Sequence, residues 1–183
     1  MTRITGRNGT PVFGIAGWKK SGKTTLTTRL VAELTGRGYA VATVKHAHHN
    51  FQIDDKETDS ARHRRAGARQ VAVVSRERWA IVRELREAPE PDFVDVLQML
   101  EPCDLILVEG YKSAPIPKIE ARRTDAFTNE PLAPKDPHVV AIAADHAADG
   151  GGRPVFALDD VAAIADFIVA RVALPPPAGS RTE

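Results

Sequence analysis

The strongest constraint on the fold of this chain is one short segment, Gly-Trp-Lys-Lys-Ser-Gly-Lys-Thr at positions 17–24. It matches the pattern G-x-x-x-x-G-K-[ST] of a phosphate-binding loop at every fixed position. The apolar run 12–16 precedes it, and a helical pattern follows it, with Leu26, Leu30 and Leu34 on one face. The segment therefore predicts a strand, a loop that cradles a phosphate, and a helix, in that order.

Each fixed position of this loop has a chemical reason. Gly17 and Gly22 allow the backbone to curl so that successive amide N–H groups point at phosphate oxygens. Lys23 adds a compact charge beside the β- and γ-phosphates, and the Thr24 hydroxyl is a ligand for Mg²⁺. The alternative is a glycine-rich turn before a solvated basic helix start. The predicted nucleotide-binding residues of the loop are Gly17, Trp18, Lys19, Lys20, Ser21, Gly22, Lys23, Thr24 and Thr25, with Lys23 also in a catalytic role.

A second element of such a site is an acidic residue at the end of a buried strand, close to the metal. The continuous apolar run 105–108 is typical of a strand buried on both faces, and Glu109 follows it directly. Because ligands bind at the carboxyl ends of parallel strands, we predict Glu109 as a metal-site residue together with Thr24. The alternative is an ordinary loop acid that pairs with Lys112.

The rest of the chain alternates apolar runs with helical patterns, which predicts an α/β fold. We expect a P-loop NTPase-like, three-layer arrangement, with a mostly parallel central sheet flanked by helices. The expected strands are 12–16, 39–44, 70–74, 79–82, 105–108, 118–122 (a candidate edge strand), 139–143 and 155–158. We further predict a flexible N-terminal arm over 1–10, one nucleotide-binding domain over 11–174 and a disordered tail over 175–183.

Composition argues against several other classes of protein. The formal net charge of 183 residues is +1, so the chain has no broad basic field for nucleic acid. No apolar stretch approaches the ~18 residues that a membrane span needs, and the first residues lack the apolar core of a signal peptide. Cys103 is the only cysteine, which excludes an intramolecular disulfide and fits a reducing cytosol.

Several blocks of sequence beyond the loop resemble one known family. Two of them are Val44-Lys45-His46-Ala47-His48-His49, after the second expected strand, and Leu105-Ile106-Leu107-Val108-Glu109-Gly110-Tyr111-Lys112 at the central one. Pro117-Lys118-Ile119-Glu120 and the stretch 139–145 add to them. On these residues, over about 12–170, the chain resembles the molybdopterin-guanine dinucleotide biosynthesis adaptor proteins, often called MobB. Asn50 departs from the family pattern, which usually has Asp there.

The resemblance implies a GTP-binding adaptor in the maturation of the molybdenum cofactor. Such a protein assists the attachment of a guanine nucleotide to molybdopterin, while a partner enzyme of the molybdopterin guanylyltransferase type performs the transfer itself. The resemblance also implies Mg²⁺, weak GTP hydrolysis, a homodimer and a cytoplasmic location. The usual guanine signature Asn-Lys-x-Asp is absent from this sequence, so the expectation of GTP over ATP rests mainly on the resemblance.

Three further features have more than one interpretation. His46, His48 and His49 are candidates for nucleotide contact or a nucleotide-dependent switch, for a Zn²⁺ or Ni²⁺ site, or for ordinary loop hydrogen bonds. Asp54 is predicted to hold a metal-bound water in a catalytic role, with a solvated loop acid as the alternative. Asp145 follows an apolar strand, where its carboxylate can accept hydrogen bonds from guanine N1–H and N2–H₂; a turn or helix cap is the alternative.

Two other functions compete with the adaptor. Small-molecule kinases and self-sufficient NTPases use the same kind of loop, but this sequence has no obvious arginine-rich lid and little room for a second substrate domain. Transfer of a γ-phosphate to a small acceptor would indicate such an enzyme. A metal-insertion GTPase would instead use the cluster His46 to His49, and tight Zn²⁺ or Ni²⁺ binding by those histidines would indicate it.

Overall fold

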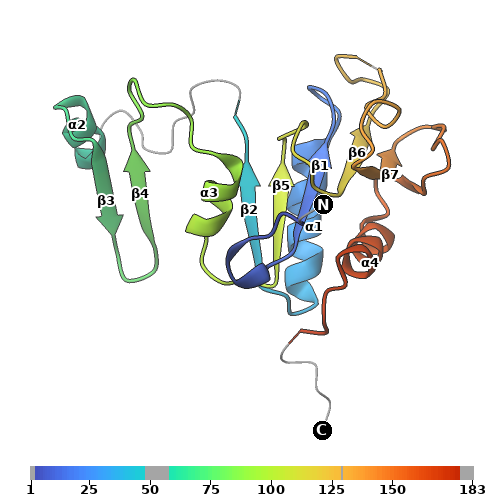
Figure 1. The fold of residues 1–183 in the computed structure, drawn as a ribbon, viewed down its shortest axis with the longest axis horizontal. Helices are drawn as coiled ribbons and strands as arrows, with labels where there is room; N and C mark the ends of the chain where they lie inside the picture. The colour runs from blue at the N-terminus through green and yellow to red at the C-terminus, as the bar shows by residue number, and fades with distance from the viewer. Residues whose placement is uncertain (1–2, 48–57, 129, 178–183) are drawn as a thin grey trace, which may run out of the picture. The chain divides into compact units, whose positions relative to one another are not determined.

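The computed structural model describes residues 3–47, 58–128 and 130–177. These residues gather in two compact units, one of Met1–His46 with Phe93–Glu183 and the other of Ala47–Asp92. The first unit contains a six-stranded sheet and the second a two-stranded one (Figure 1). The predicted domain limits at 11 and 174 stay a prediction. Within these limits, Ala47–Asp92 forms a compact unit of its own.

The six-stranded sheet is parallel throughout, in the order β2-β5-β1-β6-β7-β8. Its strands are β1 (Val12–Ala16), β2 (Val41–Lys45), β5 (Leu105–Glu109), β6 (Lys118–Arg122), β7 (Val139–Ala144) and β8 (Val155–Ala157). The chain leaves β1 for β2 on one side and later crosses from β5 past β1 to β6 on the other. This reversal at β1 is the place where open parallel sheets bind ligands. The predicted α/β class with a mostly parallel sheet is confirmed.

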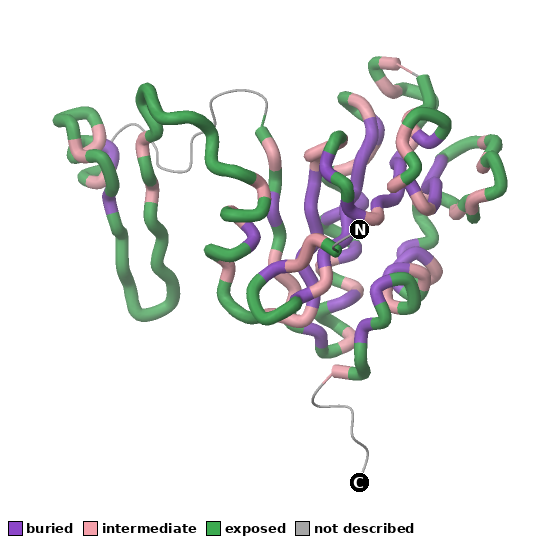
Figure 2. The backbone as a smooth tube through the Cα atoms, in the orientation of Figure 1, coloured by how far each residue is buried: buried purple, intermediate pink, exposed green. Residues whose placement is uncertain are grey.

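Helices cover both faces of this sheet. On one face, α1 (Lys23–Gly36) packs against α4 (Val161–Val172), and on the other lies α3 (Phe93–Met99). The apolar stripe predicted for α1 is buried, and Ile164 and Ile168 of α4 join it over Phe13 and Leu107. Figure 2 shows most of the central strands and parts of these helices as buried. None of the helices in the described ranges is both long and apolar enough to span a membrane.

Strand β6 lies inside the sheet, between β1 and β7, so the expectation of an edge strand at 118–122 is wrong. Its charged side chains are typical of an edge, but here they are buried and paired. Lys118 is 1% exposed, and its ammonium donates to the carbonyl oxygens of Lys112 and Ala114 at 2.7 Å and to the Asp136 carboxylate at 2.8 Å. Glu120, also 1% exposed, accepts hydrogen bonds from an arginine and two main-chain amides. Buried charges are tolerated when they are satisfied in this way.

The second unit consists of a short helix and a hairpin. The helix α2 (Asp59–Arg65) is capped by Thr58, whose side chain accepts a hydrogen bond from the Ala61 amide. Strands β3 (Gln70–Val74) and β4 (Trp79–Arg83) pair antiparallel. Most of the hairpin is exposed in Figure 2. Its exposed large apolar side chains are Val73, Val74, Trp79 and Ile81.

The described part of the predicted N-terminal arm has local structure. Arg7–Gly9 forms the 3-10 turn η1, and the Thr10 hydroxyl beside it donates to the carbonyl oxygens of Arg7 and Cys103. Thr10 is buried. The arm therefore packs on the sheet unit through the residues next to β1.

Candidate functional site

The segment 17–24 forms a loop at the carboxyl end of β1 and leads directly into α1. Gly17 and Gly22 have φ of 145° and 89°, in the region that only glycine adopts without strain. A side chain on Gly17 would also collide with the Ser21 hydroxyl and come within 2.5 Å of the Ala121 carbonyl oxygen. Both fixed glycines of the motif are therefore required by the backbone path of the loop.

The helix α1 begins with donors that have no acceptor. Its N-cap is Gly22, which has no side chain to offer. Within the described part of the chain, the main-chain amides of Gly22, Lys23 and Thr24 donate to no protein group. These amides and the positive end of the helix dipole are concentrated at one point. Such an arrangement binds phosphate oxygens.

Lys23 lies across this loop. Its Nζ is 2.6 Å from the main-chain oxygen of Trp18. Burial lowers the pKa of Lys23; Glu109 opposes that shift, while Lys45 and Lys112 add to it. The three ammonium groups thus crowd one another, and an anion placed among them would relieve their repulsion.

Glu109 and Thr24 meet, as the prediction of a shared metal site requires. Glu109 is 8% exposed, and its Oε1 accepts a hydrogen bond from the Thr24 hydroxyl at 2.6 Å. Mg²⁺ holds its oxygen ligands at about 2.0–2.1 Å in octahedral geometry, so neighbouring ligands lie roughly 2.9 Å apart. The two oxygens are close to that spacing, and a carboxylate with a hydroxyl is a fitting donor pair. Lys112, the alternative partner of Glu109, lies over the Trp18 ring at 3.9 Å from its centroid, and Lys45 pairs with Glu109 instead.

Asp145 lies just after β7, and its carboxylate is held by several neighbours. Its Oδ1 is 2.8 Å from Nδ1 of His146 and accepts the Thr124 amide at 2.9 Å, while Oδ2 is 3.4 Å from Nε of Arg123. The hydrogen bond with His146, helped by those from Thr124 and Arg123, lowers the pKa of Asp145 to about 2. Arg123 also links Asp145 to the loop, because a Cβ on Gly22 would lie 3.0 Å from Arg123 Cδ. Asp145 is therefore ionised, and Oδ2 keeps room for a further donor.

A second loop, after β6, contacts the phosphate loop, and no sequence pattern predicted this contact. The Phe127 amide donates to the Lys19 carbonyl oxygen at 3.0 Å, and Trp18 Nε1 donates to the Glu130 carbonyl oxygen at 2.6 Å. The Ser21 hydroxyl is buried nearby and has no hydrogen-bond partner within the described ranges. A narrow pocket lies there, lined among others by Trp18, Ser21, Arg122, Arg123, Thr128 and His146.

Only one of the three predicted histidines lies among the described residues. The His46 ring stacks on Tyr111 with centroids 4.5 Å apart, and Tyr111 in turn packs on Phe93. His48, His49 and Asp54 lie outside the described residues, so their predicted roles stay predictions. Over 3–47, 58–128 and 130–177, no group of three or more His, Cys, Asp or Glu side chains could hold a metal ion.

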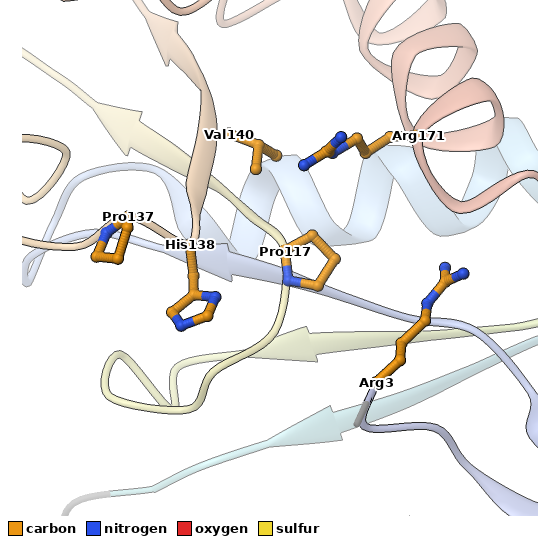
Figure 3. A pocket seen from close by; sticks show the side chains of 6 residues that line it. All are labelled: Arg3, Pro117, Pro137, His138, Val140 and Arg171. Atoms are coloured by element: carbon orange, nitrogen blue, oxygen red, sulfur yellow. The ribbon is translucent and has the colours of Figure 1, made fainter. Parts of the chain in front are cut away.

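Another hollow, of about 260 Å³, lies near the amino ends of β6 and β7 (Figure 3). It is lined by Arg3, Pro117, Pro137, His138, Val140 and Arg171. Pro117 and His138 directly precede β6 and β7, whereas the phosphate loop follows β1. Because these strands are parallel, the hollow is separate from the loop site.

Comparison with known proteins agrees with the family expected from the sequence. The family model of MobB, described as molybdopterin guanine dinucleotide synthesis protein B, matches residues 12–145. The chain belongs to the MobB family. It is 40% identical over 164 residues to the molybdopterin-guanine dinucleotide biosynthesis adapter protein of Haemophilus influenzae, covering 88% of this chain and 89% of that protein. The protein of the same name from Escherichia coli K12 is 36% identical over 170 residues, covering 91% and 95%.

Solved structures of MobB proteins share this fold. The crystal structure of a MobB homologue from Bacillus stearothermophilus aligns with a TM-score of 0.66 at 28% identity, over 88% of this chain and 97% of that one. The resemblance inferred from the sequence blocks is therefore confirmed at the level of both family and fold.

Proposed function

We propose that this MobB-family chain is a GTP-binding adaptor that assists the attachment of a guanine nucleotide to molybdopterin during synthesis of the molybdenum cofactor. The observation that carries the proposal is the phosphate loop, where the unpaired amides of Gly22, Lys23 and Thr24 lie next to the Thr24–Glu109 contact. The adapter proteins of H. influenzae and E. coli, which match nearly the whole chain, support the same process.

Different residues of the site are proposed to bind the phosphates, the metal ion and the base of GTP. The amides at the start of α1 and the Lys23 ammonium bind the β- and γ-phosphates. Thr24 and Glu109 hold Mg²⁺, which supplies positive charge next to the phosphates when it is bound. The Asp145 carboxylate accepts guanine N1–H and N2–H₂ together, a pair of donors that adenine cannot offer. A narrow pocket lined by Trp18, Arg123 and His146 lies beside these groups.

Hydrolysis of GTP by this chain is proposed to be slow. Lys45 and Thr24 both contact Glu109, so this carboxylate is held by an ammonium and a hydroxyl rather than placed to activate a water molecule. Asp54 is the residue proposed for orienting a water. Binding and release of nucleotide would then control docking to a guanylyltransferase-type partner enzyme, which performs the transfer itself.

The hairpin β3–β4 is the proposed contact between two copies of the chain. Val74 and Trp79 face each other in the ladder and are 74% and 62% exposed, and Val73 and Ile81 are also about half exposed. A two-stranded hairpin is marginally stable alone in water. Exposed apolar side chains on a free strand edge favour pairing with a second chain. We therefore propose that the chain forms a homodimer. We also propose a cytoplasmic location, which the family resemblance implies.

A side-by-side titration tests the nucleotide assignment. GTP and ATP are added to the purified protein in a calorimeter at pH 7, with Mg²⁺ and with EDTA. We expect GTP with Mg²⁺ to bind at least about tenfold more tightly than ATP, because adenine cannot offer the Asp145 carboxylate the paired N1–H and N2–H₂ donors of guanine. The variant Asp145→Asn should bring the two affinities together. Failure of every purine triphosphate to bind would contradict the proposal.

A further inference from the structure

Lys45 places its ammonium beside the two oxygens that are proposed to hold Mg²⁺. It is the last residue of β2 and lies in register with Glu109 on β5. Its Nζ is 3.2 Å from Oε1 of Glu109 and 3.5 Å from Oγ1 of Thr24, and these two oxygens are 2.6 Å apart. The three atoms form a small triangle. A cation that used both oxygens would therefore compete with this ammonium for the same position.

The other lysines of the site do not share this placement. The Lys23 ammonium donates to the Trp18 carbonyl oxygen, and the Lys112 ammonium lies over the Trp18 ring. Within the described residues, Lys45 is the lysine that contacts both oxygens of the proposed metal site. Its side chain is 59% exposed, whereas that of Glu109 is 11% exposed. The carboxylate is thus fixed, while the ammonium lies on a long flexible stem that can move away.

We propose that Lys45 is a tethered substitute for Mg²⁺. It neutralises Glu109 while the metal is absent, and it gives up Glu109 and Thr24 when Mg²⁺ arrives with the nucleotide. This inference rests on the proposed nucleotide-binding function of the loop. Two consequences follow from the competition. Free Mg²⁺ binds poorly before the nucleotide, because it would have to displace a charge that is already in place. Nucleotide without metal keeps part of its affinity, because Lys45 supplies the missing positive charge.

The first experiment uses metal alone. Mn²⁺, as a probe for Mg²⁺, is titrated into the nucleotide-free protein, and the free ion is measured by electron paramagnetic resonance. We expect Lys45→Met to bind Mn²⁺ about tenfold more tightly than the wild type, since one charge-assisted hydrogen bond no longer has to be broken. Adding Glu109→Gln to Lys45→Met should abolish that gain. Lys112→Met is the matched control, which removes a nearby charge that does not contact Glu109. Equal Mn²⁺ affinity of Lys45→Met and Lys112→Met would overturn the proposal.

The second experiment measures GTP binding by calorimetry in EDTA and in Mg²⁺. Lys45→Met should lose about tenfold in affinity in EDTA and less than about threefold in Mg²⁺, because the metal then takes over the role of the lysine. Lys112→Met should lose the same factor in both buffers. Equal losses of GTP affinity for Lys45→Met in both buffers would mean that Lys45 is a simple phosphate contact. That result would refute the proposal that Lys45 takes the place of Mg²⁺.

The two experiments separate this inference from the proposed function. A wild type that binds no GTP in either buffer would contradict the nucleotide assignment, yet the Mn²⁺ titration would still test Lys45. A purely structural ion pair would lower the urea midpoint of Lys45→Met without changing the ratio of GTP affinities in the two buffers. That result would overturn the proposal.

Discussion

The buried ammonium of Lys118 gives the most quantitative prediction. The change Lys118→Met keeps the length and apolar stem of the side chain but removes three hydrogen bonds, to Lys112, Ala114 and Asp136. An unsatisfied buried acceptor costs about 1–3 kcal/mol, and breaking a buried ion pair by removing one partner costs about 3–5 kcal/mol. Because Asp136 is 22% exposed and can be rehydrated, we expect the lower part of that range, about 3 kcal/mol.

Urea unfolding followed by circular dichroism measures this loss of the free energy of unfolding. The control is Lys135→Met, which removes the lysine from an exposed ion pair with Glu130 and should cost less than about 0.5 kcal/mol. The variants should also differ in pH dependence. Burial raises the pKa of Asp136, but hydrogen bonds from Lys118 and the His138 amide outweigh it and hold this pKa below its ordinary value.

The sign of the pH effect follows from the lowered pKa. A carboxylate with a lowered pKa stabilises the fold above its unfolded-state pKa of about 3.9, and this stability is lost as the pH falls through the folded-state value. Lys118→Met should therefore lose less stability than the wild type between pH 5 and pH 3. A loss below about 1 kcal/mol at pH 7 would show that water replaces the ammonium, and would refute the reasoning.

Three further predictions concern the site and the assembly. Lys23→Ala should weaken GTP binding by about a hundredfold with an unchanged circular dichroism spectrum, because the ammonium is proposed to bind the phosphates and donates to only one loop carbonyl. Unaltered calorimetric affinity in the folded variant would remove Lys23 from the site. Glu109→Gln should weaken Mg²⁺-dependent binding of GTP more than binding in EDTA, and an equal effect in both buffers would contradict its metal role. Trp79→Asp puts a charge on the exposed hairpin and should convert the proposed dimer to a monomer, as measured by light scattering after gel filtration. The control Val94→Asp, at an exposed position on α3, should leave the dimer intact. Monomeric wild type would rule out the dimer.

Local patterns were enough to predict the elements around the phosphate loop. The apolar run before the glycine-rich loop predicted β1, and the leucine stripe after it predicted the buried face of α1. The apolar run before Glu109 predicted β5 to within a residue. These predictions succeeded because burial on both faces produces an unbroken apolar run. The pattern could not show that Lys118 and Glu120 belong to a central strand, since their partners come from residues 112–114 and 132–136, and only the folded chain brings these together.

The sequence was least informative about which side chains from different helices, strands and loops lie next to one another. Lys45 and Glu109 are neighbours because β2 pairs with β5, a strand far away in the chain. Nothing in the sequence indicated that pairing, so Lys45 did not stand out from the other lysines. The loop 123–130 was missed because it lacks periodicity, and because it contacts the phosphate loop with main-chain atoms of its own, the Phe127 amide and the Glu130 carbonyl. Asp145, by contrast, was singled out from its place after an apolar strand, and β7 does end directly before it; its proposed role stays a prediction.

The uncapped start of α1 would couple the stability of the fold to the proposed binding of nucleotide. Where most helices carry a serine, threonine or aspartate, this one has Gly22, so water must serve its first amides until an anion arrives. Any tightly held phosphate then acts as the missing cap and raises the stability by a term that grows with ligand concentration. The melting temperature of the protein should therefore rise when such a phosphate ligand is added to the buffer. In a cell it would follow the nucleotide pool.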